Sequence, residues 1–172
     1  RPVSSGIKLE QERLFNLKKR AKIVIDTTNL SIHDLRRVLE GHFKTGEAQR
    51  LTVTLMSFGF KHGIPREADV VMDVRFLKNP NWEPELKELT GLDAKVGNYI
   101  KKDKAFGDFL KRFQDLIKPL LPRYVQEGKS YLTIAIGCTG GHHRSVYSIE
   151  RMKIWMEKQG HSVNVIHRDI MR

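Results

Sequence analysis

The sequence is short of cysteine, of long apolar runs and of acidic residues. Its single cysteine, Cys138, cannot form an internal disulfide, so a reducing cytoplasm is the expected location. No apolar run approaches the roughly 20 residues that a membrane span needs. Residues 1–22 also lack the central apolar block of a secretory signal peptide. These absences argue against secreted, disulfide-stapled and membrane-spanning classes of protein.

Two chemical signatures are missing as well. Gly140 and Gly141 are not followed by the Gly-Lys-Ser/Thr ending of a Walker A loop, so this chain should not hydrolyse ATP by that route. The seven histidines and one cysteine show no paired ligand spacing, and the adjacent His142 and His143 would tend to point in different directions. We therefore expect neither a metal nor a cofactor in this chain.

Acidic residues are outnumbered, with 20 Asp and Glu against 31 Lys and Arg, and the net charge is +11. The excess is spread along the chain and is not confined to one basic tail. A field of this sign attracts polyanions such as RNA and small anionic metabolites alike. Solvated helix faces rich in lysine would produce the same balance, so charge alone does not choose the partner.

Hydrophobic periodicity predicts an α/β protein whose first part is small. We expect a helix over residues 8–20, a short buried strand over 22–26 and a second helix that Ser31 caps. Residues 44–50 are polar and indicate a linker. A helix, a strand and a helix are too few to bury a core of their own, so we expect an upstream portion to be missing.

The second part alternates strands and helices. Expected strands cover residues 51–57, 69–76, 130–136 and 162–167, and expected helices cover 93–102, 105–121 and 143–159. The continuous apolar run in 69–76 predicts burial on both faces, and Pro119 and Pro122 are expected to end the longest helix. Strands separated by long helices predict a mostly parallel sheet with flanking helices.

Three of these strands end in polar loops, which cover residues 58–65, 73–82 and 137–145. In an open parallel sheet, ligands bind beyond the carboxyl ends of the strands. We therefore expect the functional side chains of these loops to converge on one rim, namely Lys61, His62, Asp73, Arg75, Thr139, His143 and Arg144.

The third loop, GCTGGHHRS, has the parts of an anion site. Its glycines let backbone amides approach a phosphate, and the helix that follows adds its positive end. Thr139 and Ser145 offer hydroxyl groups, and Arg144 offers a planar fork for two oxygens. A strand-to-helix turn that needs glycine only for its dihedral angles is the simpler alternative.

A second alternative comes from the spacing of Cys138, Arg144 and Ser145, which matches the Cys-x5-Arg-Ser loop of cysteine phosphatases. There the thiolate attacks phosphorus while loop amides and the arginine hold the oxygens. Glu83 could then act as the general acid. Gly137 occupies the place where a histidine is common in that class, which counts against this interpretation.

Four motifs together are more specific than any single loop. SFGFKHGIP, DVRFLKNPNW, TGLD and LTIAIGCTGGHHRSV, in this order and at these spacings, closely resemble the RapZ/YvcJ family of bacterial nucleotide-binding proteins. RPVSSGIKL and KIVIDTTNLSIHDLRR resemble the end of that family's N-terminal P-loop kinase-like domain. The resemblance therefore implies a boundary, with residues 1–47 as the end of the kinase-like domain plus linker and residues 48–172 as the C-terminal domain.

The resemblance also implies a function. The C-terminal domain of the family is similar to a sugar-phosphate-binding subdomain of phosphofructokinase, and it binds glucosamine-6-phosphate and a small RNA that it delivers to an RNase. Full-length members bind and weakly hydrolyse ATP and GTP through the upstream portion, so this chain is expected to be a regulatory binding protein. Members of the family self-assemble, so a homo-oligomer is expected. The implied sugar-phosphate ligands are Lys61, His62, Asp73, Arg75, Cys138, Thr139, Gly140, Gly141, His143, Arg144 and Ser145.

Two positions depart from the family pattern. Asn81 stands where the RNA-adapter members place a histidine in the pocket, which affects how the sugar is recognised. The sequence ends in HRDIMR, without the basic tail with which those members bind RNA, so RNA affinity is expected to be weaker or differently placed.

Overall fold

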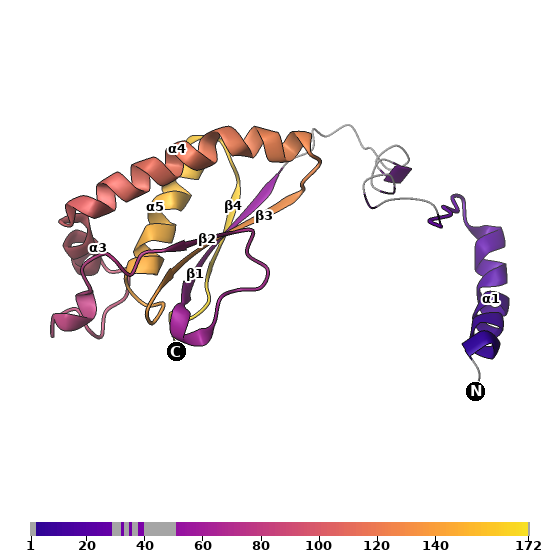
Figure 1. The fold of residues 1–172 in the computed structure, drawn as a ribbon, viewed down its shortest axis with the longest axis horizontal. Coiled ribbons are helices and arrows are strands. Elements are labelled where there is room, and N and C mark those ends of the chain that lie inside the picture. Colours follow the sequence, from indigo (N-terminus) through magenta and orange to yellow (C-terminus); the bar gives the residue numbers. More distant parts are fainter. Residues whose placement is uncertain (1–2, 29–31, 33–34, 36–37, 40–50, 172) are drawn as a thin grey trace. The chain divides into compact units, whose positions relative to one another are not determined.

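A computed structural model describes residues 3–28, 32, 35, 38–39 and 51–171 (Figure 1). The chain divides into two compact units, Arg1–Glu47 and Ala48–Arg172, which are described separately below. Within the described residues, none of the helices combines the length and the apolar character that crossing a bilayer requires.

The first unit contains helix α1, Val3–Arg20, which buries none of its residues. The strand predicted over residues 22–26 is wrong, because this segment forms no strand. A strand needs a partner for its backbone groups, and the described part of the first unit supplies no other extended segment. The chain turns instead, and the carboxylate of Asp26 accepts hydrogen bonds from the amide and hydroxyl of Thr28 at 2.9 and 2.6 Å.

The helix predicted from Ser31 lies mostly outside the described residues. The four positions that are described within it, Ile32, Leu35, Val38 and Leu39, are helical. Ile32 is 87% exposed, so its side chain is not packed within this unit.

The second unit is built on a four-stranded, all-parallel sheet with the strand order β2-β3-β1-β4. This confirms the predicted fold class. The strands are β1 Thr52–Gly59, β2 Val70–Asp73, β3 Tyr131–Cys138 and β4 Val163–His167. The helices are α3 Ala94–Lys101, α4 Lys104–Gln126 and α5 Arg144–Lys158, with short 3-10 turns η1 Phe60–His62 and η2 Pro80–Trp82.

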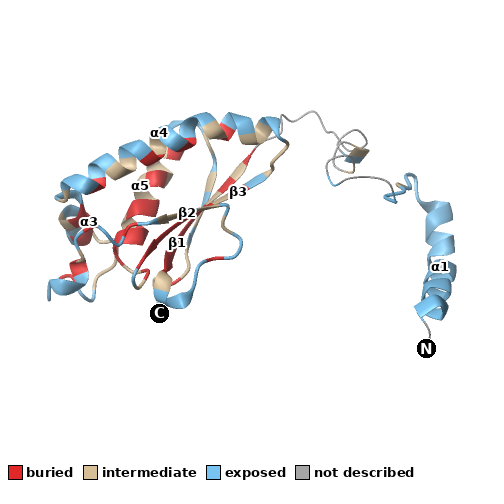
Figure 2. Ribbon diagram, in the orientation of Figure 1, coloured by how far each residue is buried: buried red, intermediate tan, exposed pale blue. Residues whose placement is uncertain are grey.

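The main core lies between the sheet and its helices (Figure 2). Alternate residues of β1 and β3 face this side, and they share one cluster with the apolar stripes of α4 and α5. The members that are fully buried include Val53, Leu55, Ile134, Ile149 and Met152. A much smaller cluster on the other side of the sheet joins Met56, Phe58 and Ala135.

Strand β2 differs from the prediction of burial on both faces. It is four residues long, it lies at the edge of the sheet, and its residues are alternately exposed and half-buried. The apolar run looked continuous because Val74, which follows the strand, is fully buried after the chain turns inward. The strands buried on both faces are the central pair, β1 and β3.

Helix α4 continues past Pro119 and Pro122, which were expected to end it. Each proline removes one hydrogen bond to the carbonyl four residues earlier. Both prolines lie on the exposed side of the helix, where water can reach the carbonyls that they free. The buried stripe runs on through Ile117 and Leu121, and this packing carries the helix across the prolines.

Replacing Ile117 by alanine is expected to lower the free energy of unfolding of the second unit by about 2–5 kcal/mol, because the side chain is 1% exposed and its removal leaves a cavity. The matched control is Leu116→Ala, whose side chain is 56% exposed and whose loss should change stability by less than about 0.5 kcal/mol. Urea unfolding followed by tryptophan fluorescence measures both, since both tryptophans lie in this unit. Equal losses in the two variants would contradict the packing described.

Candidate functional site

The carboxyl ends of the strands meet at one edge of the sheet. Gly59 at the end of β1 pairs with Cys138 at the end of β3, and Asp73 at the end of β2 pairs with Gly137. The segments that follow these strands surround a cavity of about 550 Å³. It is lined by Lys61, Asn79, Asn81, Lys87, Glu88, Leu89, Thr90, Cys138, Thr139, Gly140, His142, His143, Arg144, Ile170 and Met171.

The eleven implied sugar-phosphate ligands divide into two sets. Six of them line the cavity, namely Lys61, Cys138, Thr139, Gly140, His143 and Arg144. The other five, His62, Asp73, Arg75, Gly141 and Ser145, are not part of the lining. Three members of the second set contact the first, since Gly141 and Ser145 contact Cys138 and the carbonyl of Arg75 accepts from Arg144.

Asp73 and Arg75 bind each other. The Arg75 guanidinium donates to both carboxylate oxygens of Asp73, the shortest contact being 2.7 Å, and it lies 4.1 Å over the ring of Phe60. The hydrogen bonds from Arg75 hold the pKa of Asp73 below its ordinary value, although burial opposes them. Both side chains are almost half exposed, so this pair shapes the loop after β2 and contributes little to stability.

Arg144, the first residue of α5, is 4% exposed and is largely committed to the protein itself. Its Nη1 donates to the carbonyl oxygens of Arg75 at 2.8 Å and Leu77 at 2.9 Å, and its Nη2 donates to the hydroxyl of Thr139 at 3.2 Å. Burial lowers the pKa of Arg144, but a guanidinium remains charged at neutral pH. The side chain ties the loop after β2 to the glycine-rich loop and brings positive charge to the cavity wall.

The glycine-rich loop depends on glycine at two places. Gly141 has a φ of 87°, and a Cβ there would lie 2.8 Å from the amide nitrogen of Gly59. Outside the loop, Gly91 donates its amide to the carbonyl of His142 at 2.8 Å, and a Cβ there would lie 2.3 Å from the carbonyl oxygen of His143. Gly91 of the TGLD motif therefore packs against the backbone of the glycine-rich loop and donates a hydrogen bond to it.

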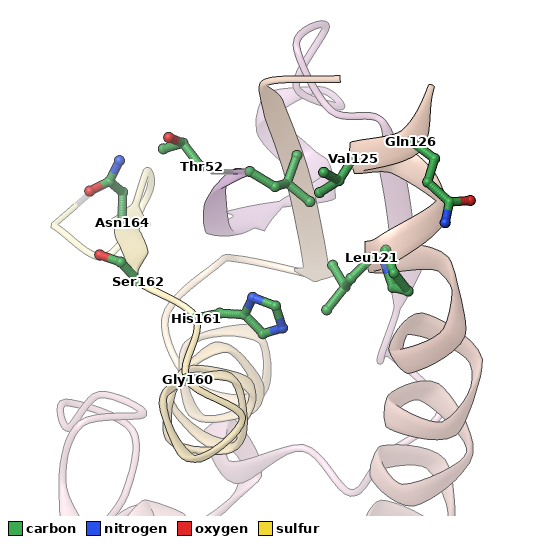
Figure 3. Close-up of a pocket in the computed structure, with 10 residues that line it drawn as sticks. Thr52, Leu121, Val125, Gln126, Gly160, His161, Ser162 and Asn164 are labelled. Carbon is green, nitrogen blue, oxygen red and sulfur yellow. The ribbon is translucent and has the colours of Figure 1, made fainter. Parts of the chain in front are cut away.

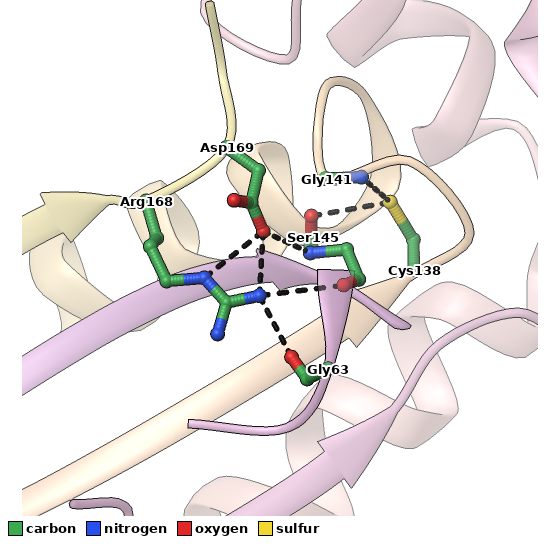
Figure 4. Close-up of polar contacts among 7 residues, drawn as sticks. Gly63, Cys138, Gly141, Ser145, Arg168 and Asp169 are labelled. Carbon is green, nitrogen blue, oxygen red and sulfur yellow. Dashed lines mark hydrogen bonds and ion pairs between the residues drawn. The ribbon is translucent and has the colours of Figure 1, made fainter. Parts of the chain in front are cut away.

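Cys138 is 3% exposed, and its Sγ is occupied by two neighbours. The hydroxyl of Ser145 lies 3.2 Å away, and the amide of Gly141 donates to the sulfur at 3.3 Å (Figure 4). Glu83, the general acid of the phosphatase alternative, lines a different pocket and accepts a hydrogen bond from Tyr99. The structure thus gives the thiol hydrogen-bond partners but brings neither a free guanidinium nor the proposed acid to it.

The two adjacent histidines face different parts of the main chain. His143 is 7% exposed and its Nε2 donates to the carbonyl oxygen of Leu86 at 3.1 Å. Burial lowers the pKa of His143, so its ring is neutral at pH 7. His142 lines the cavity, and its Nδ1 lies 3.0 Å from the carbonyl oxygen of Ile170. Among the described residues, no three His, Cys, Asp or Glu side chains gather closely enough to hold a metal ion.

The segment after β4 belongs to the site, and the sequence reasoning missed it. The buried carboxylate of Asp169 accepts from the amide of Gly59 at 2.8 Å and from Arg168 at 2.7 Å (Figure 4). Arg168 also donates to the carbonyl oxygen of Gly63 at 2.7 Å. This arrangement brings Ile170 and Met171 to the cavity. The rule that strands end at one edge applied to β4 as well, and it could have found these residues.

Other lining residues were also missed by the sequence reasoning, and these are Asn79, Lys87, Glu88, Leu89, Thr90 and His142. They come mainly from the irregular segment between β2 and α3, where no periodicity indicates direction. Asn81, noted as a departure from the family pattern, does line the cavity.

A larger cavity of about 870 Å³ lies at the opposite edge of the sheet, between the starts of β1 and β4 and the end of α4 (Figure 3). Its walls include Leu121, Val125 and His161, and no lysine, arginine or carboxylate lines it among the described residues. Size alone would favour this cavity, but the charged and polar groups converge at the carboxyl edge.

Fold and site together define a parallel α/β domain with a polar cavity at the carboxyl edge of its sheet. The sequence profile of the RapZ C-terminal domain matches residues 51–171, and that of the RapZ-like N-terminal domain matches residues 2–47. The chain therefore belongs to the RapZ family.

Relatives of similar sequence bear the name nucleotide-binding protein. One from Rhodospirillum centenum is 53% identical over 100% of this chain and 52% of its own length. Others from Paramagnetospirillum magneticum and Rhodospirillum rubrum are 48% and 49% identical over 99% of this chain and 56% and 53% of their own lengths. The chain thus spans about half the length of these relatives.

Replacing Asp169 by asparagine is expected to lower the free energy of unfolding at pH 7 by about 1.5–3 kcal/mol, because charged hydrogen bonds are lost. Burial by itself would raise the pKa of Asp169, but Arg168 and the Gly59 amide lower it overall. The contribution is therefore present above pH ~4 and is lost as the pH falls through the lowered folded-state pKa. The difference between variant and wild type should shrink in acid.

The control for this substitution is Asp108→Asn on the exposed face of α4, which should leave stability nearly unchanged. Urea unfolding of both variants at pH 7 and at acidic pH supplies the comparison. If Asp169→Asn were as stable as Asp108→Asn at pH 7, the role given to the buried carboxylate would be wrong.

Proposed function

We propose that the domain formed by residues 48–172 is a regulatory binding module for a phosphorylated amino sugar of the glucosamine-6-phosphate type. The observation that carries this proposal is the composition of the cavity at the carboxyl edge. Among its described lining residues, three are permanent cations, Lys61, Lys87 and Arg144, and one, Glu88, is acidic. Helix α5 begins at this wall, and its positive end favours an anion.

In this proposal, the phosphate of the ligand binds against the glycine-rich loop. The oxygen of the Thr139 hydroxyl accepts from Arg144, so its own proton is free to be donated to a ligand. Lys61, which follows β1, supplies a flexible charge on the same wall. These groups all donate, and a phosphate only accepts, so their chemistry is complementary.

The sugar ring would then lie toward the segment between β2 and α3. Asn79 and Asn81 line that part of the cavity, and each carboxamide can both donate to and accept from hydroxyl groups. A cavity of about 550 Å³ lies within the range of small-ligand sites. The presence of asparagine at position 81, where RNA-adapter members have a histidine, gives this chain its own pattern of hydroxyl contacts.

The wider role rests on the family and on charge. We propose that the protein senses the sugar phosphate, binds RNA and presents it to an RNase as an adapter, and that it does so as a homo-oligomer. The net charge of +11 supports binding of a polyanion. The full-length protein would bind ATP or GTP through a part that this chain does not include.

The substitution Lys61→Ala is expected to weaken glucosamine-6-phosphate binding about tenfold or more, because one charged hydrogen bond to the phosphate is lost. Lys61 is preferred to Arg144 for this test, since removing Arg144 would also release the carbonyls of Arg75 and Leu77. Isothermal titration calorimetry at low salt measures the affinity. The matched control is Lys111→Ala on α4, which lies outside the cavity lining and should bind as the wild type does. An unchanged affinity in Lys61→Ala would contradict the site.

RNA affinity is expected to fall about a hundredfold between 50 and 200 mM salt, because basic side chains that bind phosphates release condensed counterions. Fluorescence anisotropy with a labelled single-stranded RNA, titrated at several salt concentrations, gives the slope. An affinity that does not depend on salt would show that the basic excess of this chain does not serve RNA binding.

A further inference from the structure

His142 lies on the cavity wall with one ring nitrogen held by the main chain. Its Nδ1 is 3.0 Å from the carbonyl oxygen of Ile170. Because a carbonyl oxygen can only accept a hydrogen bond, Nδ1 must carry the proton. In the neutral ring Nε2 is then unprotonated, and its lone pair is a hydrogen-bond acceptor.

The other edge of the ring faces the glycine-rich loop. A Cβ placed on Gly140 would lie 3.1 Å from Cδ2 and 3.7 Å from Nε2 of His142, and 3.8 Å from Cε of Lys61. All three residues line the cavity. The Nε2 edge of the ring and the Lys61 side chain thus approach Gly140 from the same side, and the ring packs closely against this glycine.

The cations that line the cavity cannot accept a hydrogen bond. Lys61, Lys87 and Arg144 can only donate, which suits a phosphate but not an amine. Among the described lining residues, the carboxylate and imidazole side chains that could accept a hydrogen bond are Glu88, His142 and His143.

His143, the remaining ionisable side chain that could accept, is arranged differently. Its ring is buried, and its Nε2 is bound to the main chain at Leu86. His142 is held instead by the segment after β4, so the two neighbouring rings have opposite tautomers. The structure thus separates a structural histidine from one whose free nitrogen is turned toward the loop.

We propose that Nε2 of His142 accepts a hydrogen bond from the amino group of the bound sugar phosphate, so that His142 is a specificity-determining residue for amino sugars. This inference rests on the proposed function and adds the group that selects an amine over a hydroxyl. An ammonium donates a charge-assisted hydrogen bond that is roughly twice as strong as one from a neutral hydroxyl. Lys61, next to His142, would bind the phosphate, so the two side chains together would recognise the phosphate and the amino group of the ligand.

Two substitutions at this position separate the two ring nitrogens. In His142→Asn the amide nitrogen can replace Nδ1 as the donor to Ile170, but the acceptor at Nε2 is lost. In His142→Gln the longer side chain can place an acceptor near the position of Nε2, but the bond to Ile170 is lost. Calorimetry at pH 7, where the amino group of the sugar is an ammonium, measures the binding of glucosamine-6-phosphate, glucose-6-phosphate and inorganic phosphate to each protein, and thermal unfolding checks that both variants are folded.

The wild type is expected to bind glucosamine-6-phosphate about tenfold more tightly than glucose-6-phosphate. His142→Asn should bind the two sugars equally, at the wild-type affinity for glucose-6-phosphate, while phosphate binding is unchanged and His142→Gln keeps part of the preference. If His142→Asn kept the full preference, or if the wild type bound both sugar phosphates equally, the inference would be overturned while sugar-phosphate binding stood. If the wild type bound neither sugar phosphate, the proposed function itself would fail and the inference with it.

Discussion

The parallel pairing of β1 with β3 is the constraint on which the rest of the site depends. It brings the ends of the two strands together at Gly59 and Cys138, and the chain continues from both into the cavity wall. The approach is so close that a Cβ on Gly59 would lie 2.6 Å from the carbonyl carbon of Gly140. Glycine at these positions therefore serves the packing of two loops against each other before it serves any ligand.

Two buried charged side chains, Asp169 and Arg144, hold the loops that follow the strands. Asp169 gathers the amide of Gly59 and the guanidinium of Arg168, and Arg144 gathers two carbonyls of the loop after β2 and a hydroxyl of the glycine-rich loop. Charges placed in this way lose hydration, and only dense hydrogen bonding offsets that loss. The result is a wall whose shape is set before a ligand arrives, with Lys61 and Lys87 as the cations that stay flexible.

The candidate site lies within one of the two units of the chain. Every described residue that lines the cavity comes from the second unit, which the RapZ C-terminal profile covers. The profile of the RapZ-like N-terminal domain covers residues 2–47, and the relatives are about twice as long as this chain. The phosphatase alternative lacks its general acid in this geometry, because Glu83 lines a different pocket and accepts a hydrogen bond from Tyr99.

The sequence by itself determined the fold class, the approximate bounds of α3, α5 and the four strands of the second unit, and the convergence of three loops, because periodicity and the rule for parallel sheets are local or topological. It could not determine which strand lies at the edge, so β2 was misjudged. It could not show that packing at Leu121 carries α4 across its prolines. The carbonyl partners of Arg144 lie 67 and 69 residues away, and those of Arg168 lie 105 and 109 residues away. Only the tertiary structure decided these contacts, and with them which ring nitrogen of His142 and of His143 is bound to the main chain, since hydrogen bonding between distant segments leaves no spacing in the sequence.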